Sequence, residues 1–305
     1  WLKNDLRIRE QQLPDIIEKL ERNEAILPTY DAVLIDEGQD FEAEWLRLVS
    51  LLINADTQSL LLVEDRAQTI YQRKRSYVQD TGLNFQGRSK VLSINYRNTQ
   101  QIVKFAWEFY RKHSMFKNKV VNRELEGEII APQSTKRRGP EPGIVKADTF
   151  FEEMRIVARS IKKLHMEKKV PLEDILILYR VKRTHKYPII DIIKRNLRDE
   201  GLPYYWITEN DVSKRSYAKD DGKVKISTID SSKGLDFRAV FINVDSMPFP
   251  LEENKEREVS LLYIGMTRAK EYLCLSYSGE SEFTAYLDRI MVERKQKKPG
   301  IEKVN

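Results

Sequence analysis

The chain has 305 residues, of which 41% are hydrophobic and 33% charged, a balance typical of a folded globular protein rather than a disordered or membrane-embedded one. Its 53 basic and 47 acidic residues give a net charge of +6, which weakly favours polyanionic partners. No apolar run reaches the roughly 18 residues of a membrane-spanning helix, and no signal-peptide pattern is present, so no membrane partner is expected. The single cysteine, Cys274, excludes an internal disulfide framework and a cysteine zinc site, which is typical of a cytoplasmic protein.

Short apolar runs alternate with amphipathic segments in the first part of the chain. Pro14 followed by "DIIEKLERN" predicts a helix with proline in its first turn. The run "DAVLI" (31–35) predicts a buried strand, and residues 42–53 predict a helix. The apolar face expected for that helix comprises Trp45, Leu48, Val49 and Leu52. Further strands are predicted at 59–65 and 90–95, followed by a helix over 100–113. Asn98 and Thr99 are the candidate caps of that helix.

The second part of the chain continues the same alternation. Residues 123–143 carry proline, glycine and a basic run without a clear period, so they predict connecting structure. Helices are predicted at 152–169, 187–201 and about 253–270, with one more at the end. Strands are predicted at 143–149, 174–179, 203–208, 223–228, 239–244 and 272–277. Alternating strands and helices indicate a mostly parallel sheet covered by helices, with ligands at the carboxyl ends of the strands.

Three basic clusters stand out against this background. They are "YQRKRSY" (71–77), "KRR" (136–138) and "ERKQKK" (293–298). All three fit a solvated surface, and only the first, which lies among tyrosines, points to more than that.

The stretch "YDAVLIDEGQDF" (30–41) is the first candidate site. The predicted strand delivers two adjacent carboxylates, Asp36 and Glu37, at its carboxyl end. Buried carboxylates are costly unless a cation offsets them. Nucleotide hydrolases use such a pair to hold Mg²⁺ with one acid and to orient water with the other, although an acid-rich surface turn would show the same residues.

Four further polar clusters border predicted strands. "VEDRAQTIY" (63–71) offers a glutamine and a tyrosine, and "NYRNTQ" (95–100) offers a ring suited to stacking on adenine and a guanidinium suited to phosphate. "ISTIDSSKGLDF" (226–237) combines hydroxyls with a lysine, a glycine and an acid. "LLYIGMTRAKE" (261–271) is a predicted helix that carries an arginine.

Taken together and in this order, the five clusters resemble the motifs of superfamily 1 helicases of the UvrD/PcrA/Rep type. "DEGQD" is similar to motif II, "VEDRAQTIY" to motif III, "INYRNTQQI" to motif IV, "TIDSSKGLDF" to motif V and "LYIGMTRAKEYLCLS" to motif VI. The resemblance covers about residues 30–277. It implies an α/β fold of two P-loop NTPase (RecA-like) lobes with mostly parallel sheets. The first lobe would be incomplete, and the second complete but without the family's large helical insertion.

The resemblance implies a role for each matched residue. Asp36 would coordinate Mg²⁺, and Glu37 would activate the water that attacks ATP. The catalytic set would be completed by Gln68, Arg97 and Arg268. The nucleotide would also be bound by Tyr96, Gln39, Gly234 and Asp236. Nucleic acid would be contacted by Tyr71, Arg73, Thr228, Ser232 and Lys233.

The chain also departs from the family's pattern. It contains no "GxxxxGK[ST]" loop, which in the family precedes motif II, and it starts at Trp1. We therefore expect a fragment that lacks ATPase activity by itself. Only residues 209–223 stand where the family inserts a helical subdomain, as in compact members, some of which carry a nuclease-related domain upstream. Arg73 replaces the family's tryptophan, Asp230 its histidine and Asp236 its glutamate.

These observations predict three segments and two competing functions. Residues 1–95 would be the rest of the first lobe, 96–143 a connection and 144–305 the second lobe. The first function is part of an ATP-dependent translocase or helicase, of 3′ to 5′ polarity by resemblance, on single-stranded or partly duplex DNA. The alternative is a nucleic-acid-binding regulatory module of the helicase fold without ATP turnover. A metal-dependent nuclease built on "DEGQD" would leave the other clusters unexplained.

Overall fold

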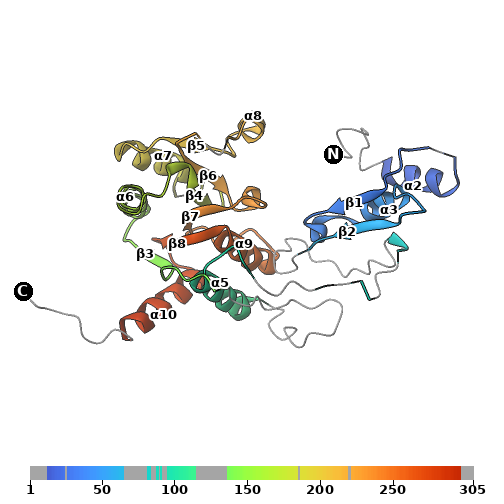
Figure 1. Cartoon of the computed structure of the whole chain (residues 1–305). Coiled ribbons are helices and arrows are strands. Elements are labelled where there is room, and N and C mark those ends of the chain that lie inside the picture. The colour runs from blue at the N-terminus through green and yellow to red at the C-terminus, as the bar shows by residue number, and fades with distance from the viewer. Residues whose placement is uncertain are drawn as a thin grey trace, which may run out of the picture. The chain divides into compact units, whose positions relative to one another are not determined.

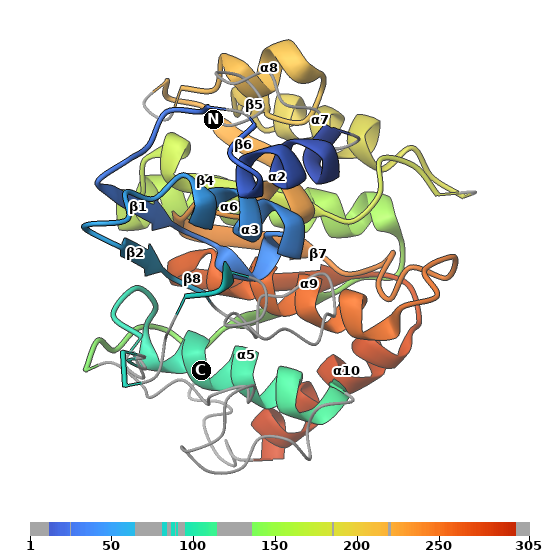
Figure 2. The same ribbon diagram turned by 90° about the vertical axis from the view of Figure 1, so that its right-hand side faces the viewer.

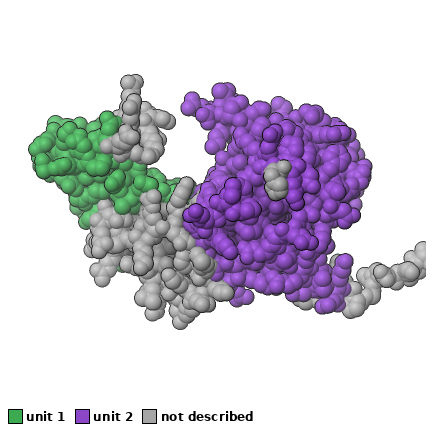
Figure 3. Space-filling view, turned by 180° about the vertical axis from the view of Figure 1, so that it is seen from behind, with its two compact units in different colours: residues 1–92, 119–130 green, residues 93–118, 131–305 purple. Residues whose placement is uncertain are grey.

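The computed structural model describes residues 12–24, 26–64, 81–83, 87, 88, 90, 95–114, 136–184, 186–218 and 221–296. The chain forms two compact units, residues 1–92 with 119–130 and residues 93–118 with 131–305 (Figure 3). Within the described ranges, no helix combines the length and apolar character needed to span a membrane.

In the first unit, the described residues form two parallel strands and two α-helices. Its elements are α2 (Leu13–Glu21), β1 (Ala32–Ile35), α3 (Ala43–Leu51) and β2 (Ser59–Leu62). Pro14 lies in the first turn of α2, as the sequence predicts. β1 and β2 are neighbours with Ala32 opposite Ser59, and α3 connects them. Parallel pairing therefore places the ends of both strands at the same edge of the sheet.

Helix α3 packs on two sides rather than on the single face that the sequence predicted. Trp45, Leu48 and Leu52 form one cluster with Leu13 of α2. Leu46 and Val49 form a second cluster with Ile35 of β1. The one-face expectation was wrong because α3 lies between α2 and the sheet, so its buried surface is wider than an amphipathic stripe.

The second unit is built on a six-stranded sheet that is entirely parallel (Figure 1). The strand order is β3-β8-β7-β4-β6-β5. The strands are β3 (Gly143–Lys146), β4 (Ile175–Tyr179), β5 (Tyr204–Trp206), β6 (Val224–Thr228), β7 (Phe237–Asn243) and β8 (Ala269–Tyr277). This confirms the predicted α/β class with a parallel sheet, as expected for a RecA-like lobe. The all-buried pattern of β4 fits a strand covered on both faces.

Helices cover both faces of this sheet (Figures 1 and 2). On one face, α6 (Phe150–Lys168) and α7 (Ile189–Asp199) form a core with alternate residues of β4, β6 and β7. On the other face lies α9 (Lys255–Thr267), where Gly265 packs against Leu178 and Ile242. α5 (Gln100–His113) packs on α9, and α10 (Glu282–Gln296) joins it through Phe283 and Tyr286 against Phe109. Because α9 is enclosed between the sheet and α5, it is buried nearly all round.

Most predicted elements are present, with two differences that bear on the site. The helix predicted to end near residue 270 ends at Thr267, because β8 begins at Ala269 without an intervening loop. Thr99 occupies the cap position of α5 without a side-chain cap bond, and Asn98 instead bonds to the end of α9 and the start of β8. Among the described residues between β5 and β6, the one helix is the five-residue α8 (Asp211–Arg215), in line with the expected lack of a large insertion. The strand predicted at 90–95 falls largely outside the described residues.

Candidate functional site

In the first unit, Asp36 and Glu37 directly follow β1 at its carboxyl end. Asp36 Oδ1 accepts a hydrogen bond of 2.9 Å from the backbone N–H of Glu37. Glu37 has a φ of 55°, in the left-handed region, which turns the chain sharply after the strand. Gly38 then donates its N–H to the carbonyl of Val63 at 2.8 Å, and a Cβ on Gly38 would lie 2.9 Å from the side chain of Leu62. The acids are thereby held at the edge where β1 and β2 both end.

The donor set of this turn fits the implied magnesium ion. Asp36 is exposed and offers a carboxylate, which is a hard oxygen ligand, at a strand end. Mg²⁺ usually takes one or two carboxylates and completes its shell with phosphate oxygens and water. Among the described residues no group of three or more His, Cys, Asp or Glu side chains is placed to hold a metal, so a magnesium ion here would rely on such additional ligands.

Several residues predicted in the first unit are not described. Gln68, Tyr71 and Arg73 lie outside the described residues. The backbone of Gln39 belongs to a short 3-10 helix, Gly38–Asp40. Their predicted roles remain predictions.

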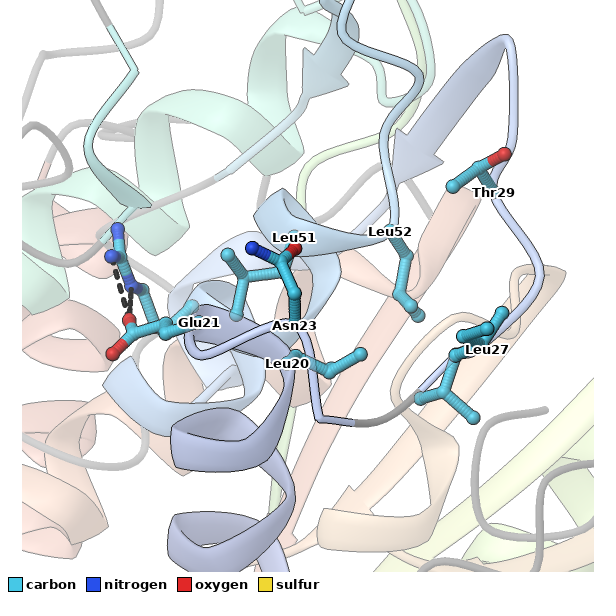
Figure 4. Close-up of a pocket in the computed structure, with 9 residues that line it drawn as sticks. Leu20, Glu21, Asn23, Leu27, Thr29, Leu51 and Leu52 are labelled. Carbon is cyan, nitrogen blue, oxygen red and sulfur yellow. Dashed lines mark hydrogen bonds and ion pairs between the residues drawn. The ribbon is translucent and has the colours of Figure 1, made fainter.

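The first unit also has a surface hollow of about 640 Å³ that none of the predicted residues lines (Figure 4). It lies where α2 and α3 meet the segment leading to β1, beside the ion pair between Arg47 and Glu21. Its lining residues are Leu20, Glu21, Asn23, Ile26, Leu27, Thr29, Arg47, Leu51 and Leu52. The largely aliphatic lining gives it no resemblance to a phosphate site.

In the second unit, three predicted residues gather at the amino ends of β7 and β8. Phe237 and Ala269, the first residues of these strands, are paired, so Asp236 and Arg268 precede neighbouring strands. Asp236 Oδ2 lies 2.9 Å from Lys270 Nζ and 4.0 Å from Arg97 Nε. The sequence had not singled out Lys270. It shares the acid with Arg97 and adds a positive charge to the site.

Arg268 is 1% exposed and holds the same corner together. Its Nε and one terminal nitrogen donate to the carbonyls of Ile264 and Leu235, both at 3.2 Å. Its own carbonyl accepts the N–H of Phe237 at 3.0 Å. The arginine of the predicted motif VI is therefore bonded directly to the backbone of the predicted motif V, next to Asp236.

Asn98 fixes the turn that carries Tyr96 and Arg97. Asn98 is 1% exposed, and its Nδ2 donates to the carbonyls of Thr267 at 2.8 Å and Ala269 at 2.6 Å, on either side of Arg268. Asn95 Nδ2 donates to Asn98 Oδ1 at 2.7 Å. This buried amide joins the segments that carry both predicted arginines, while Tyr96 is 73% exposed. The sequence had indicated Asn98 only as a helix cap.

The segment between β6 and β7 contains the other predicted residues. Thr228 ends β6, and its hydroxyl accepts the N–H of Ser231 at 3.3 Å. Ser232 is buried and donates its hydroxyl to the carbonyl of Ile229 at 2.7 Å, so the hydroxyl stabilises the turn itself. Lys233 (φ −59°, ψ 136°) and Gly234 (φ 79°) are the central residues of a type II turn closed by Leu235 N–H on Ser232 O at 3.0 Å.

The predicted residues of this unit thus lie at opposite ends of the sheet. Thr228 is at the carboxyl end of β6, whereas Asp236 is at the amino end of β7. The rule that ligands of such sheets lie at the carboxyl ends of strands does not cover Asp236 and Arg268, which lie at the amino ends of β7 and β8. Consecutive parallel strands require the connecting chain to return to the opposite end of the sheet.

An ion-pair network surrounds Asp230 at the carboxyl end. The carboxylate of Asp230 accepts hydrogen bonds from the guanidinium groups of Arg257, at 2.8 Å, and Arg180, at 3.4 Å. Arg180 lies 2.8 Å from Glu258, which is fully buried, and Glu252 pairs with Arg257. Arg257 and Glu258 lie in the first turns of α9, whose last turns precede Arg268. One helix therefore connects the Asp230 network with the Arg268 corner, a link that residue spacing did not reveal.

Comparisons with known proteins identify a family for the chain. A family model described as the UvrD-like helicase C-terminal domain matches residues 90–221 and 209–280. The chain is 25% identical over 269 residues to a "Probable DNA helicase" of Mycoplasma pneumoniae, covering 84% of this chain and 45% of that protein. It is 27% identical over 198 residues to the ATP-dependent DNA helicase PcrA of Bacillus subtilis, covering 63% of this chain and 24% of that protein.

Two further similarities concern a helicase/nuclease protein and a solved structure. The chain is 26% identical over 217 residues to a component of the ATP-dependent helicase/nuclease of Streptococcus pyogenes, covering 61% of this chain and 17% of that protein. The solved C-terminal domain of a possible DNA helicase from a Lactobacillus strain, WCFS1, matches with a TM-score of 0.41 and 20% identity over 63% of this chain and 92% of that domain. The chain thus spans less than half the length of these three curated relatives.

Proposed function

Because this chain belongs to the family of UvrD-like helicase C-terminal domains, we propose that it is part of a motor that couples ATP hydrolysis to the unwinding of DNA. The motor would translocate 3′ to 5′ along a single strand. The relative named as an ATP-dependent DNA helicase supports ATP and DNA as its ligands. The helicase/nuclease relative supports a nuclease-related domain in the same protein. A cytoplasmic location is proposed from the single cysteine, which fits a reducing compartment.

The observation that carries this proposal is the corner formed by Arg97, Arg268, Asp236 and Lys270. Segments distant in the sequence bring two arginines, a lysine and an acid to the amino ends of two neighbouring strands. Arginine donates fixed, parallel N–H groups that suit phosphate oxygens. Arg97 and Arg268 would stabilise the charge that develops on the transferred phosphoryl group. The exposed ring of Tyr96 would stack on the adenine.

In the first unit, the acids after β1 would complete the chemistry. Asp36 would hold Mg²⁺, and Glu37 would take a proton from the attacking water. A bound magnesium ion neutralises the charge of the phosphates. The turn fixes the Asp36 carboxylate and the backbone that carries Glu37, because Asp36 accepts the N–H of Glu37 and Gly38 is bonded to Val63. Gln39 and Gln68 would sense the nucleotide from the same lobe.

Coupling to the strand would use the two ends of the second unit. Thr228 and Lys233, with Tyr71 and Arg73 of the first unit, would contact the nucleic acid. Helix α9 contacts the predicted motif V at Asp230 through Arg257 and ends at Arg268. A change in phosphate contacts at Arg268 would therefore shift α9 and, through Arg257 and Asp230, the segment that carries Thr228 and Lys233.

One observation favours the second candidate function for the 305 residues by themselves. They contain no "GxxxxGK[ST]" loop, whose backbone N–H groups and lysine cradle phosphates. Without such a loop this polypeptide would bind nucleic acid but would not turn over ATP. A protein that also carries such a loop would supply hydrolysis.

The purified chain provides the test. A fluorescently labelled single-stranded oligonucleotide should bind, with an affinity that falls steeply with salt. Lys233→Ala should make the negative slope of log K against log salt shallower by about 0.7. Lys163→Ala, which removes an exposed lysine of α6, should leave this slope unchanged. ATP hydrolysis should be absent with or without DNA. Absence of strand binding at low salt, or hydrolysis that disappears in Glu37→Gln, would contradict the proposal.

A further inference from the structure

The basic run Lys136–Arg138, which its sequence pattern alone marks only as a solvated surface, is docked on the first turn of α5. The carbonyl of Arg137 accepts the N–H of Gln100 at 2.9 Å. The guanidinium of Arg137 donates to the carbonyl of Arg97 at 2.7 Å. Gly139 donates its N–H to Gln101 Oε1 at 2.9 Å. Three hydrogen bonds thus hold the run beside the turn that presents Tyr96 and Arg97.

The docking depends on a close approach at Gly139. A Cβ at this position would lie 2.6 Å from Cγ2 of Thr99, the residue that precedes α5. Thr99 is 1% exposed and lies at the start of the helix, so it has little room to move aside. Only glycine fits this contact, which fixes the position of the three preceding basic residues.

The docked run concentrates positive charge at the amino ends of β7 and β8. Lys136, Arg137 and Arg138 are all exposed, and Arg137 bonds to the carbonyl of Arg97, whose own side chain lies at this corner with Lys270. The acid of this corner is Asp236, which Arg97 and Lys270 share. A second acid, Glu271, is paired with Arg238 at 2.7 Å. The corner therefore has an excess of cations that suits a ligand with several negative charges.

The position of this positive charge distinguishes between two possible polyanionic ligands, a nucleoside triphosphate and a nucleic-acid strand. The run lies with Tyr96 and Arg97 at the amino end of the sheet, whereas Thr228, the strand-contact candidate at the end of β6, lies at the carboxyl end. We propose that Lys136 and Arg138 bind the phosphates of the nucleoside triphosphate and that Gly139 positions them. This proposal rests on the proposed function, because it extends the nucleotide site assigned to Arg97. The exposed Tyr96 and the exposed cations next to it suit the base and the phosphates of one such ligand.

Binding measurements on the 305-residue chain test the proposal. ATP and inorganic tripolyphosphate are titrated at low salt up to millimolar concentration, and a labelled single-stranded oligonucleotide is titrated in parallel. Lys136→Ala/Arg138→Ala should weaken ATP and tripolyphosphate binding by about tenfold, because two charge-assisted contacts are lost. Gly139→Ala keeps every positive charge and should still weaken both ligands. The matched control Lys163→Ala/Lys168→Ala removes the same charge from α6 and should have little effect.

Each outcome decides the question. Selective loss of ATP and tripolyphosphate binding in the 136/138 and 139 variants, with strand binding unchanged, supports the proposal. Loss of strand binding alone would identify the run as a nucleic-acid contact and overturn it. Equal losses in the control variant, no loss in any variant, or a wild-type chain that binds neither ATP nor tripolyphosphate would also overturn it. Strand binding by the wild-type chain tests the proposed function separately.

Discussion

Replacing Asn98 tests the arrangement of the Arg268 corner most directly. The buried amide donates two hydrogen bonds, to the carbonyls of Thr267 and Ala269, and accepts one from Asn95. Asn98→Ala removes all three and leaves buried polar groups unsatisfied, so we expect unfolding free energy to fall by about 2–4 kcal/mol. Asn98→Asp instead places carboxylate oxygens against two carbonyl oxygens, and an uncompensated buried charge typically costs about 3–5 kcal/mol.

The pH dependence of Asn98→Asp provides the decisive signature. The aspartate's pKa should be raised by burial and by the two carbonyls, so lowering the pH protonates it and restores one donor. The penalty relative to Asn98→Ala should therefore shrink as the pH falls. Urea unfolding followed by circular dichroism measures this, and Asn210→Asp is the control, because aspartate caps α8 as well as asparagine does. Equal stability of the alanine and aspartate variants at every pH would refute the assignment of the amide as donor to both carbonyls.

Three further perturbations have defined outcomes. Burial, followed by Lys112 and Arg289, lowers the pKa of His113 to about 4 from 6.5, so the unfolded chain takes up a proton first as the pH falls. Stability should drop between pH 6.5 and about 4 by about 2–3 kcal/mol, and His113→Phe should remove this drop in urea titrations at several pH values. Burial, and then Asp245, raise the pKa of Glu153 well above 4.5, so its stabilising contribution is present below pH 4.5 and is lost as the pH rises through the folded pKa. The unfolding free energy of Glu153→Gln should therefore increase relative to that of the wild type as the pH rises. A difference between the two that does not change with pH would contradict this. Gly234→Ala should cost about 1 kcal/mol at its φ of 79°, and Gly234→Asn less, in thermal unfolding; equal costs would argue against backbone strain.

The order and type of the elements could largely be predicted from apolar periodicity. The helix expected over 100–113 has those bounds, because Ile102, Val103, Ala106, Phe109 and Tyr110 recur at helical spacing and are buried. Gly201, expected to end α7, takes a left-handed φ of 70° two residues after the helix. Periodicity failed to predict the buried residues of α3, because this helix packs against both α2 and the sheet. It also misplaced the end of α9, because this helix is followed almost directly by β8.

The candidate site was predictable only in part. Asp36 and Glu37 follow a strand in the sequence and in the structure, so a local rule sufficed. The role of Asn98 was missed because its carbonyl partners lie 169 and 171 residues away, and that of Lys270 because its acid precedes a different strand. Long-range contacts of this kind depend on strand order, which alternation alone does not determine. The basic run at 136–138 was likewise uninformative without its hydrogen bonds to the start of α5.

The segment between Thr228 and Phe237 has almost no spare length. Thr228 is level with Tyr179 on β4, and Ala239 is level with Ile175, four residues lower. Phe237 lies two residues below Ala239, so the chain must descend by about six residue rises, or about 20 Å. It must also pass sideways over β4 by about 10 Å, which makes about 22 Å in all. The turns Ile229–Ser232 and Ser232–Leu235 each span less than about 7 Å, and the remaining three steps bring the reach to about 25 Å. Deleting two residues here would force a turn or a strand end to open. Selection on this connection should therefore act on its number of residues as strictly as on their identity.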